Sequence, residues 1–114
     1  MKKLSVLSIN VDLLQKFQDI LRFRGFRSIH SPKLIGGTSE GAGAVFRLDY
    51  KGQTPCLAQS PQLHKQMSIS GNRKRVYEVG AVFRAEDYFT HRHSCEFTGL
   101  DVEMVIEQHY SEVR

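Results

Sequence analysis

The residues best suited to chemistry lie in two neighbouring segments, 75–86 and 96–104. Side chains alternate between the two sides of a β-strand, so residues two apart share a side. A guanidinium can grip phosphate or carboxylate oxygens, and an aromatic ring can stack on a flat base. The alternation therefore predicts one surface suited to a charged nucleotide, carrying Arg84, Glu86, Phe97, Asp101 and Glu103.

Arg84 is the residue on which this prediction depends most. An arginine at the end of a strand offers a fixed fork that can hold a carboxylate and a phosphate oxygen together. Activation of an amino acid needs its carboxylate in line with the α-phosphate of ATP while negative charge accumulates there. The residues leave open a structural ion pair of Arg84 with Glu86 or Glu103. Phe97 could equally be a core residue, although it shares the side of Asp101.

The elements that position these residues follow from the spacing of apolar residues, glycine and proline. A helix is predicted from Asp12 with Gly25 as its C-cap, and then a short strand at 26–29 that Pro32 ends. The segment 4–9 is predicted as a leading strand or a frayed segment. The apolar positions of the helix are Leu13, Leu14, Phe17, Ile20 and Leu21.

A glycine-rich loop and a hairpin are predicted in the middle of the chain. Glycines at 36–43 favour a mobile loop, and the segments 45–50 and 54–58 favour a hairpin that turns at positions 51–52. The loop and the hairpin lead to the helix that precedes the strand pair.

That second helix is predicted to begin with Ser60 as N-cap and Pro61 at the first helical position, and to end near Gly71. Gln62 and Lys65 are three residues apart, so they share one face of the helix. A lysine can pair with a substrate carboxylate, whereas a single lysine on a helix is more often simply exposed. The sequence alone leaves both alternatives open.

Length and composition indicate one soluble domain. The chain has 114 residues, 40% hydrophobic and 25% charged, with a formal net charge of +4. That charge tolerates a polyanion without demonstrating one, so a basic RNA-binding module rests only on the charge and on the turn at 72–75. The two cysteines have no paired spacing, which fits a reducing compartment, and no stretch is long enough to span a membrane.

The segment 83–86, Phe-Arg-Ala-Glu, resembles the centre of motif 2 of the class II aminoacyl-tRNA synthetases. The longer run of Thr-His-Arg-His at 90–93 and Glu-Phe-Thr-Gly-Leu-Asp at 96–101 is similar to aspartyl-tRNA synthetases of the eukaryotic and archaeal type. The resemblance extends back through the segments 59–66, 36–41 and 29–34.

This resemblance implies an α+β fold, in which residues 1–114 form part of the class II antiparallel sheet with flanking helices. Motif 1 is expected at about 13–34 and would build a homodimer interface, while motif 2 is expected at about 75–104. Pattern alone would instead pack the motif 1 helix on its own core. Motif 3, with its second ATP-binding arginine, and the anticodon-binding barrel have no counterpart in these residues.

The resemblance also implies a set of binding residues, with Arg84 as the catalytic one. The family uses Mg2+ with ATP, but the expected Mg2+ ligands have no counterpart here. The spacing of His91 and His93 offers no third ligand, so no metal site is predicted. The implied ATP-binding residues are Arg84, Glu86, Arg92, His93, Ser94 and Phe97. The implied aspartate-binding residues are Glu40, Gln59, Gln62, Lys65, Arg84 and Asp101.

The function implied is that of a cytoplasmic aspartate–tRNA ligase, which forms aspartyl-adenylate from L-aspartate and ATP and transfers aspartate to tRNA(Asp). The expected partners are these substrates and a second copy of the chain or a full-length synthetase, with no membrane. The alternative is a truncated, non-catalytic paralogue or fragment that acts as a dimerisation or nucleotide-binding module.

Overall fold

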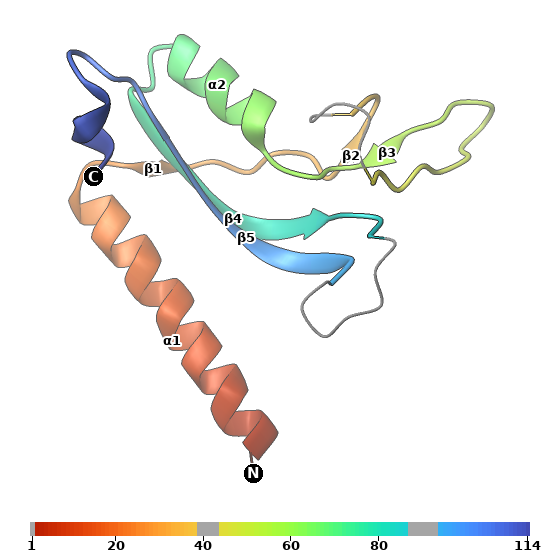
Figure 1. Cartoon of the computed structure of the whole chain (residues 1–114), viewed down its shortest axis with the longest axis horizontal. Helices are drawn as coiled ribbons and strands as arrows, with labels where there is room; N and C mark the ends of the chain where they lie inside the picture. The colour runs from red at the N-terminus through yellow and green to blue at the C-terminus, as the bar shows by residue number, and fades with distance from the viewer. Residues whose placement is uncertain (1, 39–43, 87–93) are drawn as a thin grey trace.

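A three-stranded sheet forms the centre of the fold (Figure 1). The computed structural model describes residues 2–38, 44–86 and 94–114. The sheet has the order β1-β4-β5, in which β4 pairs parallel with β1 and antiparallel with β5, and β2 and β3 form a separate antiparallel pair. The predicted α+β class is confirmed. The elements are α1 (Lys2–Phe23), β1 (Arg27–Ser28), β2 (Leu34–Ile35), β3 (Cys56–Leu57), α2 (Gln62–Ser70), β4 (Arg75–Phe83), β5 (Glu96–Met104) and the 3₁₀-helix η1 (Tyr110–Val113).

Helix α1 begins ten residues earlier than Asp12, so the prediction of a strand or frayed segment at 4–9 is wrong. No glycine or proline lies between Lys2 and Phe23, and apolar residues recur every three or four positions from Leu4. The serines at positions 5 and 8 fall between those apolar positions and do not interrupt the helical period.

The end of α1 was predicted correctly. Gly25 has a φ of +82°, which is the left-handed conformation that glycine adopts without strain. Its amide donates to the Arg22 carbonyl at 3.0 Å, and the Phe26 amide donates to the Leu21 carbonyl at 2.9 Å. This pair of bonds is the Schellman arrangement, and it directs the chain into the short strand β1.

The register of β4 and β5 decides which residues share a surface. Glu78 lies opposite Asp101, and Val82 lies opposite Phe97. Directly paired residues point to the same side of an antiparallel sheet. The polar side of β4 and the polar side of β5 therefore coincide, as the alternation predicted.

The core lies where the two sheets and α2 meet. Tyr77 is fully buried on the opposite side of the sheet, against α1, and its hydroxyl accepts a hydrogen bond from Arg22 Nε at 3.0 Å. Its ring also makes an edge contact with Phe17, with 6.4 Å between the ring centroids. Helix α1 itself buries no residue, and it extends away from the sheet (Figure 1). The buried apolar residues are Cys56, Ala58, Val76, Tyr77 and Val82.

The predicted hairpin is confirmed by reciprocal backbone hydrogen bonds between Tyr50 and Gln53, at 3.0 and 2.9 Å. Lys51 and Gly52, the two residues at its turn, both have positive φ, which matches the twist of a tight hairpin. Helix α2 begins at Gln62, one residue later than predicted, with Pro61 in the N-cap position.

Within the described ranges, no helix combines the length and the apolar character needed to cross a membrane.

Glu112 holds the C-terminal turn together. Its carboxylate accepts hydrogen bonds from the backbone amides of Glu107, Gln108 and His109 at 3.1, 2.7 and 2.7 Å. These hydrogen bonds hold the pKa of Glu112 below its ordinary value, and the bond from the His109 amide contributes most. The positive charge of Arg75 lowers the pKa further. A lowered folded-state pKa means that the ionised carboxylate stabilises this turn.

We expect the turn to lose this stabilisation in acid. The contribution is complete above the ordinary glutamate pKa of about 4.3 and is lost as the pH falls through the lowered folded-state pKa. NMR titration of the amides of Gln108 and His109 measures it. Glu112→Gln should remove the transition, whereas a transition at or above the ordinary pKa would contradict the prediction.

Candidate functional site

Arg84 and Phe97 lie side by side on the polar surface of the sheet. The backbone of Arg84 is fixed directly after β4, because its amide donates to the Cys95 carbonyl at 2.8 Å. Its guanidinium carbon is 5.7 Å from the centre of the Phe97 ring. Phe97 is 40% exposed, so the alternative of a core phenylalanine is wrong. The pair presents a cation and a flat apolar ring to the same space.

Lys65 forms the second feature of this surface. Helix α2 packs against β4 and β5 (Figure 1), and Lys65 is the one residue of that helix that is buried, at 4% exposure. Its Nζ atom lies 3.2 Å from Asp101 Oδ1 and 3.5 Å from Glu103 Oε2. The alternative of a simply exposed lysine is therefore wrong. One cation between two carboxylates leaves this cluster with one negative charge in excess.

Glu78 is a buried carboxylate to which the sequence assigned no role. Its Oε1 atom accepts from Lys33 Nζ at 2.6 Å and from the Ser31 hydroxyl at 2.9 Å. Its Oε2 atom accepts from the Ser31 amide at 3.1 Å. These bonds tie the segment after β1 to the floor of the site. The alternation of side chains along the strand places Glu78 on the polar side, and this is the sequence feature that could have identified it as part of the site.

Two glycines leave the surface of the sheet without side chains between the Lys65 cluster and Phe97. Gly80 of β4 lies opposite Gly99 of β5. A Cβ atom added to Gly99 would lie 2.9 Å from Asp101 Oδ2, so a side chain there would displace the carboxylate. Asp101 and Phe97 are four residues apart, or about 13 Å along the strand. This spacing separates the Lys65 cluster, at one end of the surface, from the Arg84–Phe97 pair at the other end.

The other predicted residues have different surroundings. Gln59 is buried at 6% exposure, and its Oε1 atom has no hydrogen-bond partner among the described residues. Gln62 and Glu86 are half-buried, and Ser94 is exposed. The predicted residues Glu40, Arg92 and His93 lie outside the described residues, as does His91.

Within the described part of the chain, no three His, Cys, Asp or Glu residues are grouped so that they could hold a metal ion. Asp101 and Glu103 are instead neighbours of Lys65. The structure thus brings together on one surface Lys65, Arg84, Phe97 and Asp101 of the predicted site, and it places Glu103, which was predicted on the same surface, beside Lys65.

The chain is similar to known proteins over most of its length. Residues 2–113 match the family model described as tRNA synthetases class II (D, K and N). Aspartate–tRNA ligase 1, cytoplasmic, from Arabidopsis thaliana is 70% identical over 97 residues, which cover 85% of this chain and 18% of that protein. Aspartate–tRNA ligase 2, cytoplasmic, from the same plant is 62% identical over 109 residues, covering 96% and 20%.

A solved structure has the same fold. The asparaginyl-tRNA synthetase of Pyrococcus horikoshii, complexed with asparaginyl-adenylate, matches with a TM-score of 0.80 at 31% identity, covering 86% of this chain and 22% of that one. The chain spans about a fifth of the length of the curated relatives that it matches. The family match covers nearly every residue, so the chain belongs to the class II tRNA synthetases of the D, K and N group.

Proposed function

We propose that this chain provides part of the ATP- and aspartate-binding floor of an aspartate–tRNA ligase. The enzyme would form aspartyl-adenylate from L-aspartate and ATP, and would then transfer aspartate to tRNA(Asp). The observation that carries the proposal is the position of Arg84 over Phe97, on the surface that also holds Lys65 and Asp101. The Arabidopsis relatives are named as cytoplasmic ligases, which supports a cytoplasmic location.

In the first step, an α-carboxylate oxygen of aspartate attacks the α-phosphorus of ATP. The bond from that phosphorus to the bridging oxygen breaks, and pyrophosphate leaves with the electron pair. Arg84 would hold the carboxylate and an α-phosphate oxygen together and would stabilise the negative charge that builds up between them. Phe97 would stack on the adenine and so fix the position of the α-phosphate relative to Arg84.

The Lys65 cluster would select aspartate. An ammonium has three N–H donors, and Asp101 and Glu103 occupy two directions around Lys65. The third donor would bind the side-chain carboxylate of the substrate. Asp101 would accept the α-ammonium group, and Gln59 would offer its buried acceptor to the same substrate.

The remaining predicted residues complete the proposal. Gln62 would join the aspartate-binding residues from α2, and Glu40 would close over the amino acid. Glu86, Arg92, His93 and Ser94 would join Arg84 around ATP. Mg2+ would neutralise phosphate charge when it is bound with ATP, but the described residues form no metal-binding group, so we assign none of them to hold it.

Replacing Arg84 with alanine is expected to weaken ATP binding by about tenfold to a hundredfold, because charge-assisted hydrogen bonds contribute about 1.5–3 kcal/mol. Isothermal titration calorimetry measures the affinity, and aspartate-dependent ATP–pyrophosphate exchange measures the chemical step. Arg24→Ala removes an exposed arginine in the turn directly after α1 and serves as the matched control. Unchanged ATP affinity in Arg84→Ala would contradict the proposal.

A second function is favoured by the surface of α1. This helix buries no residue and exposes large apolar side chains, among them Leu4, Leu7, Ile9 and Phe23, the last at 93%. A helix that exposes apolar side chains on several sides fits a dimerisation or nucleotide-binding module without catalysis, which would pair with a second copy or a full-length synthetase. ATP binding without ATP–pyrophosphate exchange would favour this second function.

We expect α1 to mediate self-association. Leu7→Glu should weaken the dimer by at least about tenfold, since burying a leucine contributes about 1.5–3 kcal/mol. Sedimentation equilibrium measures the association, and Lys16→Glu changes a polar position of the same helix as the control. A wild-type chain that is monomeric at all concentrations would refute dimerisation through α1.

A further inference from the structure

Lys33 and Glu78 form an ion pair on the polar surface of the sheet, beside the Lys65 cluster. Lys33 Nζ lies 2.6 Å from Glu78 Oε1, and the side chains are 28% and 3% exposed. The lysine side chain lies over Gly80, where an added Cβ atom would be 3.4 Å from both Cε and Nζ of Lys33. The proposed function gives this ion pair no part in the reaction, although it lies on the same surface.

Glu78 is a direct neighbour of the proposed aspartate site. It lies opposite Asp101 in the register of β4 and β5, so the two side chains point to the same side of the sheet. The Cβ atoms of such a pair are about 4.5–5.5 Å apart. Asp101 Oδ1 lies in turn 3.2 Å from Lys65 Nζ. The charge of Glu78 therefore acts at short range on the ammonium that would bind the substrate carboxylate.

The net charge at this end of the surface depends on Lys33. Three carboxylates and two ammonium groups leave one negative charge in excess, and without Lys33 the excess would be two. Aspartate brings a negative side chain to this place, whereas asparagine brings a neutral one. An added negative charge therefore acts against aspartate in particular. The groups counted are those of Lys33, Lys65, Glu78, Asp101 and Glu103.

The fold holds both members of the pair in place. The Lys33 carbonyl accepts from the Ala58 amide at 2.8 Å, and the Ala58 carbonyl accepts from the Phe83 amide at 3.0 Å. Glu78 also accepts from the amide and the hydroxyl of Ser31, so it would keep its position if Lys33 lost its charge. Compensation of the Glu78 charge needs no access to solvent, so a second copy covering the outer side of residues 13–34 would leave it unchanged.

We propose that Lys33 is a positioning residue that sets the preference for aspartate over asparagine. Its ammonium compensates the charge of Glu78, so that Lys65 stays available for the side-chain carboxylate of the substrate. Without this compensation, Glu78 would attract the Lys65 ammonium and repel the substrate carboxylate. The inference rests on the proposed function, in which Lys65 binds that carboxylate.

Isothermal titration with L-aspartate and with L-asparagine tests the proposal. Lys33→Met should weaken aspartate binding at least about tenfold, because two unit charges a few ångströms apart near a protein surface interact by more than the equivalent of a tenfold change. It should change asparagine binding less than about threefold. The double variant Lys33→Met/Glu78→Gln removes one charge of each sign, so it should return aspartate affinity to within about threefold of the wild type.

The double variant separates charge compensation from other roles of Lys33. It lacks the bond between Lys33 and Glu78, as Lys33→Met does, so a purely structural link would leave aspartate binding weak in both variants. A direct contact between Lys33 and the substrate would also leave it weak in both. Recovery in the double variant supports charge compensation, and no recovery overturns it.

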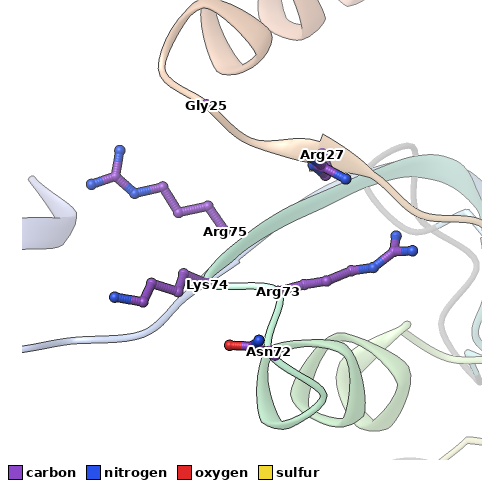
Figure 2. Close-up of a pocket in the computed structure, with 6 residues that line it drawn as sticks. All are labelled: Gly25, Arg27, Asn72, Arg73, Lys74 and Arg75. Carbon is purple, nitrogen blue, oxygen red and sulfur yellow. The ribbon is translucent and has the colours of Figure 1, made fainter.

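The matched control is the exposed pair of Lys74 and Glu107, whose Nζ and Oε1 atoms lie 3.1 Å apart. Lys74 lies in the basic turn directly before β4, where Figure 2 shows it between Arg73 and Arg75. Lys74→Met and Lys74→Met/Glu107→Gln should both keep aspartate affinity within about twofold, because water and salt screen exposed charges. A loss in Lys74→Met equal to that in Lys33→Met would overturn the proposal, since net charge alone would then explain both.

Urea unfolding without ligand gives a second, independent measurement. Lys33→Met leaves the buried carboxylate of Glu78 without its cation, whereas the double variant has a neutral amide there, so the double variant should have the higher urea midpoint. An equal or lower midpoint would overturn the proposal. A wild-type chain that binds no aspartate would refute the proposed function together with this inference. Wild-type binding with unchanged affinity in Lys33→Met would refute the inference alone.

Discussion

Replacing Glu78 with alanine is expected to lower the free energy of unfolding by about 3 kcal/mol. Glu78 is 2% exposed, and its carboxylate accepts bonds from the Lys33 ammonium and from both the amide and the hydroxyl of Ser31. Its removal leaves those part-buried donors without their acceptor. Lys33 is 28% exposed and regains some water, which places the expected loss at the lower end of the range for broken buried ion pairs.

Urea unfolding followed by circular dichroism measures this loss. Glu107→Ala is the matched control, because Glu107 also pairs with a lysine but at an exposed site, and it should cost less than about 1 kcal/mol. Glu78→Gln keeps the shape of the side chain and one acceptor oxygen. Its loss in the free energy of unfolding should therefore lie between those of Glu78→Ala and Glu107→Ala, and it can be measured if Glu78→Ala fails to fold. Equal losses for Glu78→Ala and Glu107→Ala would show that burial of the Glu78 pair has no consequence.

Replacing Lys65 with methionine is expected to weaken aspartate binding by about a hundredfold or more. The ammonium of Lys65 is buried, so water does not compete for the substrate carboxylate that we propose it binds. The substitution also leaves Asp101 and Glu103 without the cation between them, and these carboxylates would repel the negative substrate. Methionine fills the space of the lysine stem, which limits the loss of packing.

Isothermal titration with L-aspartate measures the change, and urea unfolding is followed in parallel. Lys74→Met applies the same substitution to the exposed lysine of an ion pair and should leave aspartate affinity within about twofold. If Lys65→Met lost stability but kept aspartate affinity, Lys65 would be a structural ion-pair residue and the proposed aspartate site would be wrong.

Local patterns predicted the features that depend on neighbouring residues. The turn at Lys51 and Gly52 and the glycine end of α1 follow from backbone conformations that few residues adopt. The prediction of a strand or frayed segment at 4–9 is wrong because a helix tolerates the serines at positions 5 and 8 between its apolar positions. The family itself was identified from the runs of residues around Phe83-Arg84-Ala85-Glu86 and Phe97.

By itself, the sequence determined which side of each strand carries the chemical groups, because side chains alternate strictly along an extended backbone. That is why Arg84 and Phe97 could be placed on one surface before the register was known. Only the tertiary structure decided that Lys65 is buried against Asp101, 36 residues away, and that Glu78 holds Lys33, 45 residues away. These contacts depend on how α2 and the segment after β1 pack on the sheet. Burial, which sets the strength of the interaction between two charges, is a property of that packing.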